Sequence, residues 1–366
     1  MFPLIKFPVF VRVAITTLAL TNLLPALTAA ELEEVASFPN QQVTGVAVSK
    51  TGRVFVNFPD WSDDHTLSVA ELKDGKPVPF PNGEWNKPGP AESHLICVQS
   101  VFVDDTDDLW ILDPAAPKMQ EIVKGGPKLL RVDLKKNEVV QTISFDETIA
   151  PKKSYLNDVR VDRNAGYAFL TDSGIGAIIA VDLNSGKARR LLEGHKSVKA
   201  EPDVKLTVDG RELLDEQKKK APQMNSDGIA LDLTNDWLYY HALTGHTLYR
   251  IKTAFLKDAS LSKSDLESKV EEVAKTPAPD GMLAGKDGSV YLTDLEDNAI
   301  MRYEPATKSL TKVVQDKRLS WPDTMSWGPG GQLYVTASQI ENMPRFNGGR
   351  SARTEPYKVF RLSLSQ

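Results

Sequence analysis

The sequence contains a single cysteine, Cys97, so no disulfide can form within one chain. It also contains no Asn-x-Ser/Thr acceptor, which excludes N-glycosylation and favours a bacterial envelope or secreted setting. Cys97 lies in the apolar stretch "LICVQSVFVD", where a buried and unreactive thiol is expected. Stability must therefore come from a large apolar core, which 366 residues with 41% hydrophobic side chains can supply.

The chain also lacks a concentrated charge of one sign and the common catalytic signatures. Its formal net charge is −5, and its Lys and Arg residues are scattered without the basic stripe that duplex nucleic acid needs. His-Glu-x-x-His, Gly-x-Ser-x-Gly and the P-loop are absent, so the familiar zinc-protease, serine-hydrolase and nucleotide-binding motifs are excluded. We therefore expect no nucleic-acid partner.

Only the first thirty residues have the pattern of a targeting segment. Lys6 and Arg12 precede an uncharged stretch, 13–30, that ends in small residues. This pattern predicts a secretory signal peptide over residues 1–30, with cleavage after Ala30. An uncleaved membrane anchor is the alternative, because the stretch reaches the lower limit for a bilayer span. We predict a secreted or periplasmic protein with one domain, residues 31–366, and no membrane contact after cleavage.

One pattern recurs six times: a polar or small start, an alternating strand, a turn of Gly, Asn or Asp, and a second strand. Each copy predicts a β-hairpin, and further strands such as "GAIIAVDL" bring the unit to the size of a propeller blade. The sequence therefore predicts an all-β, six-bladed β-propeller, closed by pairing residues 32–39 with residues 357–365. The six copies start at Val43, Val98, Leu156, Ser226, Pro279 and Pro322.

Three longer connections interrupt the repeat. The segment 194–223 is too polar for a blade core and is predicted to form a flap. The segment 261–274 has apolar residues at helical spacing and predicts a short surface helix. The segment 73–94 is rich in Pro and Gly and predicts a loop. Long connections around a rigid ring are where binding surfaces usually lie.

Equivalent positions of the six copies should line the central channel, because the innermost strand of each blade faces it. The second residue of every copy is polar, which predicts a ring of Thr44, Gln99, Asn157, Asp227, Asp280 and Asp323. The ends of the second strands carry Asn57, Asp113, Asp172, His241, Asp294 and Ala337. For the carboxylates of this second set we favour turn capping, and for His241 a role in the channel wall.

The first ring would repel itself if it were dry and empty. Water, retained protons or a hard cation must offset its carboxylates, and oxygen ligands without Cys or clustered His favour Ca²⁺ or Mg²⁺ over structural zinc. Turn capping is the equally weighted alternative. Under the metal hypothesis Asn157, Asp227 and Asp280 are the ligands, and Asp323 or His241 is the catalytic proton acceptor. Trp321 lies beside a loop, where it could line a ligand cleft.

Several phrases in order resemble the major royal jelly protein/yellow family over residues 43–346. They include "DDLWILDPA", "SYLNDVRVD", "AFLTDSGIGAIIAVDL", "DGIALDLTNDWLYYHALTGHTLYRI" and "LSWPDTMSWGPGGQLYVTAS". The resemblance implies a secreted six-bladed propeller. Insect members include proteins credited with dopachrome conversion, salivary proteins that bind biogenic amines in the channel, and royal jelly storage proteins. One cysteine and no glycosylation acceptor depart from the insect pattern and suggest a microbial member.

The stretches "LNDVRVD", "SDGIALD" and "PDGMLAGKDGSVYLTD" are also similar to the gluconolactonase/senescence-marker propellers, whose channel binds one divalent cation. This second resemblance implies that Asn157 matches the channel Asn of that family and Asp280 its metal-binding Asp. Asp227 stands where that family usually has a metal-binding Asn. The family's first-blade Glu is missing, since "VTGVAVS" offers only Thr44. Three of the four ligands are thus present.

Three functions remain open on these observations. The first, which we favour, is a monomeric secreted propeller that binds a small organic molecule at one mouth of the channel, where Thr44, Gln99, Asn157 and Trp321 would contact it. The second is a lactonase-like hydrolase in which a divalent cation polarises a ring ester and lowers the pKa of bound water. The third is a scaffold whose outer loops bind another protein.

Overall fold

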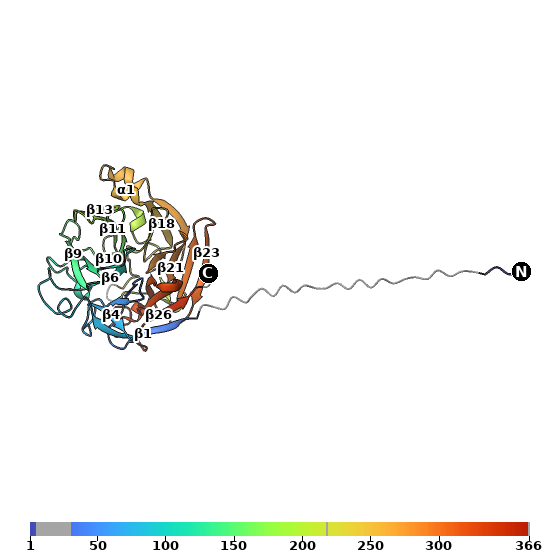
Figure 1. Cartoon of the computed structure of the whole chain (residues 1–366), viewed down its shortest axis with the longest axis horizontal. Coiled ribbons are helices and arrows are strands. Elements are labelled where there is room, and N and C mark those ends of the chain that lie inside the picture. Colours follow the sequence, from blue (N-terminus) through green and yellow to red (C-terminus); the bar gives the residue numbers. More distant parts are fainter. Residues whose placement is uncertain (5–30, 217–218, 365–366) are drawn as a thin grey trace.

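The computed structural model describes residues 1–4, 31–216 and 219–364 and consists of six four-stranded antiparallel sheets arranged around a ring (Figure 1). The chain colours in Figure 1 follow the ring once, so that the blue β1 lies beside the red β26. The prediction of an all-β, six-bladed propeller is confirmed. Apart from residues 1–4, the predicted signal peptide lies outside the described residues.

The six blades follow the six sequence copies, with the innermost strand first in each. Blade 1 contains β2 (Gly45–Val48), β3 (Val54–Asn57), β4 (Val69–Lys73) and β5 (Lys76–Pro79). Blade 2 contains β6 (Ser100–Val103), β7 (Asp108–Asp113), β8 (Lys128–Asp133) and β9 (Glu138–Ser144). Blade 3 contains β10 (Leu156–Asp162), β11 (Tyr167–Asp172), β12 (Ala177–Asp182) and β13 (Ala188–Leu191).

The remaining three blades complete the ring in chain order. Blade 4 contains β16 (Ser226–Asp232), β17 (Trp237–Ala242), β18 (Thr247–Lys252) and β19 (Glu271–Lys275). Blade 5 contains β20 (Met282–Ala284), β21 (Val290–Asp294), β22 (Ala299–Glu304) and β23 (Ser309–Gln315). Blade 6 contains β24 (Pro322–Trp327), β25 (Gln332–Ala337), β26 (Tyr357–Ser363) and β1 (Glu33–Phe38).

The ring closes by pairing β1 with β26, as the sequence predicts. Ala36 pairs with Val359 and Phe38 with Tyr357 across an antiparallel ladder. This closure covers the free edge of β26 and ties residues more than 300 positions apart into one sheet. The apolar core lies between neighbouring blades, where the faces of adjacent sheets pack against each other, as in the buried cluster shared by blades 2 and 3.

The segment 261–274 forms a shorter helix than predicted. The helix α2 (Lys263–Glu267) begins at the cap Ser262, whose hydroxyl accepts a hydrogen bond from Asp265 N at 3.2 Å, and residues 271–275 form β19. The helix prediction is wrong for the end of this segment, because residues from Glu271 onward pair with β18 as a strand. A second short helix, α1 (Thr253–Lys257), lies at the rim of the ring beyond β18 (Figure 1). No helix among the described residues is long and apolar enough to span a membrane.

The described part of the predicted flap, residues 194–216 and 219–223, packs over Trp321 at one end of the channel. It contains the 3₁₀ turn η2 (Lys196–Val198) and the hairpin β14 (Thr207–Val208) to β15 (Arg211–Glu212). Leu206, Val208 and Leu213 share one buried cluster with Trp321 and with the turns η4 (Ile340–Asn342) and η5 (Pro344–Phe346). The other 3₁₀ turns are η1 (Pro117–Met119) and η3 (Pro329–Gly331).

Candidate functional site

The predicted ring residues lie at or just before the innermost strands, and none exposes more than 8% of its surface. These six residues are buried because the inner strands of neighbouring blades lie close together. A Cβ atom on Gly281 would meet the carbonyl oxygen of Asp323, and one on Gly228 would meet that of Asp280. Glycine after Asp227 and after Asp280 therefore lets three blades bring their acidic residues together around the channel.

Asp227 and Asp280 form the centre of this site. Their carboxyl groups interact directly, and this interaction raises the pKa of Asp227 and lowers that of Asp280, so Asp227 holds its proton more strongly. Burial, followed by the charge of Asp280, raises the pKa of Asp227 well above its usual value. Burial raises the pKa of Asp280 to about 7, although the Trp321 indole, which donates to Asp280 Oδ2 at 2.6 Å, opposes that rise.

Asp323 contributes a third carboxyl group. Its Oδ2 accepts a hydrogen bond from the Ser338 hydroxyl at 3.1 Å, and its Oδ1 accepts one from the Thr324 hydroxyl at 3.2 Å. Burial and the neighbouring charges of Asp280 and Asp158 raise the pKa of Asp323 well above its usual value. The structure thus brings Asp227, Asp280 and Asp323 into one electrostatically linked group, as the repeat alignment predicts.

A fourth carboxyl group, Asp158, was missed by the sequence analysis, together with its partner Arg160. Arg160 Nη2 lies 3.5 Å from Asp158 Oδ2, and both residues are buried. The guanidinium also donates to the carbonyl oxygens of Val159 and Met282, each at 2.7 Å. The signal was present in "LNDVRVD", where Asp158 occupies the position of Gly228 and Gly281 in the other copies.

The three remaining ring residues hold neighbouring side chains in place. Asn157 Nδ2 donates to the Ser173 hydroxyl at 3.0 Å. Gln99 Oε1 accepts from the Tyr155 hydroxyl at 2.8 Å, and that hydroxyl accepts from the Trp61 indole at 2.8 Å. Thr44 Oγ1 accepts from Asn57 at 3.0 Å, within blade 1. Asn157 and Gln99 are therefore in direct contact with Ser173 and Tyr155, respectively.

Ser173 and Tyr155 line a cavity of about 470 Å³ at this end of the channel. Its volume suits a small organic molecule. The flap forms one wall and the loops of blades 2, 3 and 6 form the others. The lining residues are Met119, Gln120, Lys152, Lys153, Ser154, Tyr155, Ser173, Gly174, Lys220, Ala221, Pro222, Gln223, Met224 and Arg345. Trp321 is not among them; it is fully buried under the flap, with its indole directed at Asp280.

The carboxylates at the ends of the second strands cap turns. Asp172 Oδ1 accepts from the backbone N–H groups of Tyr155, Gly174 and Ile175, and Asp294 Oδ1 accepts from Glu296 N and Asp297 N. These bonds satisfy backbone N–H groups that would otherwise be buried without a hydrogen-bond partner.

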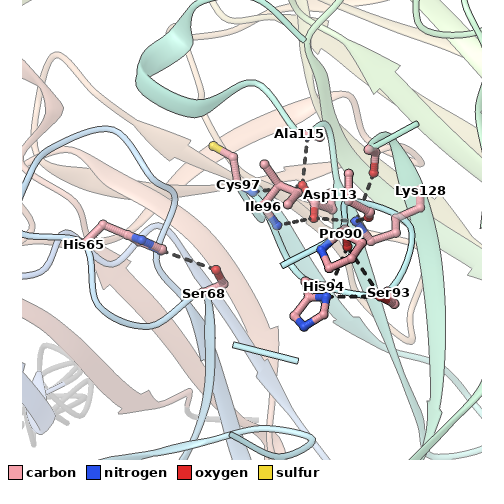
Figure 2. A network of polar contacts seen from close by, with 12 residues as sticks. His65, Ser68, Pro90, Ser93, His94, Ile96, Cys97, Asp113, Ala115 and Lys128 are labelled. Carbon is pink, nitrogen blue, oxygen red and sulfur yellow. Dashed lines mark hydrogen bonds and ion pairs between the residues drawn. The ribbon is translucent and has the colours of Figure 1, made fainter. Parts of the chain in front are cut away.

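Asp113 has the same capping role within a larger network (Figure 2). It accepts from the backbone N–H groups of Ile96, Cys97 and Ala115, and it forms a fully buried ion pair with Lys128 at 3.0 Å. Lys128 also donates to the carbonyl oxygen of Ala91, which anchors the Pro- and Gly-rich loop. Cys97 is buried there, and burial raises the pKa of its thiol far above the usual range, as expected for an unreactive cysteine.

His241 lies in a buried wall position. Its Nδ1 donates to the carbonyl oxygen of Ala242 at 2.6 Å, and its Nε2 lies 3.0 Å from the Thr276 hydroxyl. Burial lowers its pKa to about 4, so the ring is neutral at pH 7 and Nε2 accepts from Thr276. Both nitrogens are thus engaged outside the carboxylate group.

The ring residues do not fit a divalent cation as they are arranged. Among residues 1–4, 31–216 and 219–364, no three or more His, Cys, Asp or Glu side chains are grouped so as to hold a metal ion. The raised pKa of Asp227 means that a bound cation would have to displace a proton there, and the Trp321 N–H already occupies Asp280 Oδ2. In this channel, protonation and the Arg160 guanidinium reduce the negative charge of the buried carboxyl groups.

The fold and this site define a six-bladed propeller with a buried acidic channel and a cavity at one mouth. The family model "Major royal jelly protein" matches residues 96–351, and the chain belongs to this family. Major royal jelly protein 3 of Apis mellifera is 23% identical over 238 residues, or 62% of this chain. The match spans 42% of that protein, so the chain corresponds to less than half of this relative.

Solved propellers share the fold at low sequence identity. A calcium-binding regucalcin from Agrobacterium tumefaciens is 12% identical, with a TM-score of 0.56 over 92% of this chain and 94% of that one. A gluconolactonase from Xanthomonas campestris is 12% identical, with a TM-score of 0.52 over 92% of this chain and 90% of that one. The chain therefore has gluconolactonase- and regucalcin-like structural neighbours, and at this identity the likeness shows only a shared fold.

Proposed function

We propose that this protein binds a small organic molecule in the cavity at the channel mouth. The observation that carries the proposal is the connection between cavity and ring: Tyr155 and Ser173 line the cavity and are hydrogen-bonded to Gln99 and Asn157. A ligand held there would have apolar contacts with Met119 and Met224 and polar contacts with Ser173. The lining is mainly polar, so polar and charged groups would fix the orientation of the ligand and the methionines would contact its apolar part.

The lactonase-like alternative needs a cation on Asn157, Asp227 and Asp280, followed by proton transfer to Asp323 or His241. The proton shared by Asp227 and Asp280 and the engagement of both His241 nitrogens favour binding over this chemistry. Because one structural neighbour is a calcium-binding protein, metal binding by this chain is measured directly in the experiment below. A scaffold for another protein is the third possibility, and it requires no ligand in the cavity.

Isothermal titration calorimetry and thermal shift with catechol, indole and phenyl compounds test the proposal on the purified mature protein. We expect at least one compound to bind, and Ser173→Ala to weaken that binding about tenfold, since a hydrogen bond to an enclosed ligand is lost. Ser309→Ala, at an exposed position on the outermost strand of blade 5, is the matched control.

The same calorimetry separates the three functions. Binding by none of the organic compounds would sink the proposal and leave the scaffold ahead. Heat with Ca²⁺, Mg²⁺, Mn²⁺ or Zn²⁺ that disappears in Asp280→Ala, together with lactone hydrolysis that disappears in the same variant, would establish the lactonase instead.

A further inference from the structure

Among the described residues, the cavity at the channel mouth is lined by basic side chains and by no acidic one, although the whole chain has a net charge of −5. Its charged lining residues are Lys152, Lys153, Lys220 and Arg345. We propose that the ligand of this cavity is a small organic anion, an apolar or aromatic body that carries a carboxylate. This inference rests on the proposed function and specifies the chemical class of the ligand.

Two of the four basic residues are already neutralised. Arg345 Nη2 forms a 2.8 Å ion pair with Asp215, and its Nη1 contacts Met119 Sδ at 3.4 Å, so its side chain is fixed at the wall. Lys152 is paired with Glu121 at 3.0 Å. Lys153 and Lys220 have no acidic partner within 4.0 Å in the part of the chain that the structure describes. The cavity therefore carries an excess of positive charge that an anion would balance.

The uncharged polar groups at the inner wall also favour an acceptor. The Ser173 hydroxyl accepts a hydrogen bond from Asn157 and has no acceptor of its own among the described residues, so its proton is available to a ligand. The Tyr155 hydroxyl is already engaged as donor and as acceptor. Met119, Pro222 and Met224 supply apolar wall for the body of the ligand.

The acidic group deeper in the channel sets the orientation of such a ligand. The charges of Asp158, Asp280 and Asp323 raise the pKa of Asp227, and those of Asp280 and Asp158 raise the pKa of Asp323, so this end of the channel disfavours a further anion. The carboxylate of the ligand consequently binds among Lys153, Lys220 and the Ser173 hydroxyl and not deeper in the channel, while the body packs against Met119, Pro222 and Met224. A cationic amine would have to place its charge against Lys153 and Lys220 to occupy the same cavity.

Matched compounds that differ only in charge test this inference by calorimetry at low salt. The probes are indole-3-acetate, indole-3-acetamide and tryptamine, with phenylacetate, phenylacetamide and phenethylamine as a second set. We expect the carboxylate of a set to bind about tenfold tighter than its amide, the sum of two partly exposed charge contacts, and the amine to bind weakest. The preference should shrink at 0.5 M NaCl, because salt screens exposed charges.

The double variant Lys153→Gln/Lys220→Gln should abolish the difference between carboxylate and amide while leaving amide binding unchanged. Both side chains are exposed, so the fold should not suffer, and Lys135→Gln on the far turn of blade 2 is the control. Equal binding of all three charges, preference for the amine, or an anion preference that survives in the double variant would overturn the inference while leaving the proposed function standing. No binding by either set would overturn both.

Discussion

The Asp227 and Asp280 carboxyl groups behave as one acid pair rather than as two independent side chains. Both are buried, the two carboxyl groups interact directly, and Trp321 donates to Asp280 Oδ2. Burial disfavours a charged carboxylate, and a second charge beside it costs more still, so the pair retains a proton to a higher pH than free Asp does. Stability must therefore depend on pH through this pair.

The direction of that dependence follows from the raised pKa values. The folded protein holds protons that the unfolded chain releases near pH 4, so the stabilisation is complete below that pH and is lost as pH rises through about 7, the pKa of Asp280. In Asp227→Asn an amide replaces the protonated acid and still donates to Asp280. We expect this variant to be more stable than wild type at pH 8, by about 1 to 3 kcal/mol, and less different at pH 5.

Chemical denaturation at both pH values provides the measurement. Asp74→Asn, at an exposed turn between β4 and β5, should leave the pH dependence unchanged. A loss of stability at pH 8 in Asp227→Asn would show that the pair does not retain a proton in the folded protein.

A single residue of this site could be predicted only where the same residue type recurs at the equivalent position of several repeat copies. Asp227, Asp280 and Asp323 occupy equivalent positions in three copies, so alignment found them. Asp158 and Arg160 occur in one copy at positions where the others are small or apolar, and comparison of the second residue alone missed them. The bond from Trp321 to Asp280 depends on how two blades and the flap pack, which local sequence does not encode.

The inner strands are held in register by threonines of the neighbouring strands and by glycines. Thr171 Oγ1 in β11 donates to the carbonyl oxygen of Asp227, and Thr336 Oγ1 in β25 donates to that of Thr44, each at 2.7 Å. Thr293 Oγ1 in β21 accepts from the N–H groups of Asp280 and Gly281. The "LTD" and "VTA" endings of blades 3, 5 and 6 thus connect their second strands to inner strands of the channel, and Gly281 leaves the space that β24 needs.

Gly281→Ala should therefore disturb β20 and its neighbour β24. The added methyl group would meet the carbonyl oxygen of Asp323, and we expect a loss of about 1 to 3 kcal/mol in unfolding free energy because the close packing of two inner strands must open. Gly83→Ala is the matched control, since its methyl group would meet nothing within 4 Å. Urea unfolding followed by tryptophan fluorescence measures both variants, and equal stability of the two would contradict this account of the channel.

At the scale of the whole molecule, the number of blades and the closure of the ring could be predicted because both are periodic features. Six hairpin copies gave six blades, and the leftover strands at the two ends of the mature chain had only each other as partners. The position of the flap over the channel could not be predicted in the same way. Leu206, Val208 and Leu213 meet Trp321 through contacts of about one hundred residues' separation, and nothing in a non-repeated segment states which mouth it covers.

Covalent closure of the ring tests how far the β1–β26 ladder limits unfolding. Ser37 and Lys358 are direct partners in this ladder, and such partners have Cα separations that a disulfide accommodates. Since Cys97 is buried, Ser37→Cys/Lys358→Cys should form one new bond and raise the unfolding free energy by about 2 to 5 kcal/mol, because the bond removes conformational entropy from the unfolded chain. Melting temperatures with and without reductant measure the effect. The offset pair Ser37→Cys/Arg361→Cys should give no gain, because these residues are not partners. If the matched pair also gives no gain, separation of β1 from β26 is not the first step of unfolding, and the flap or another blade must open earlier.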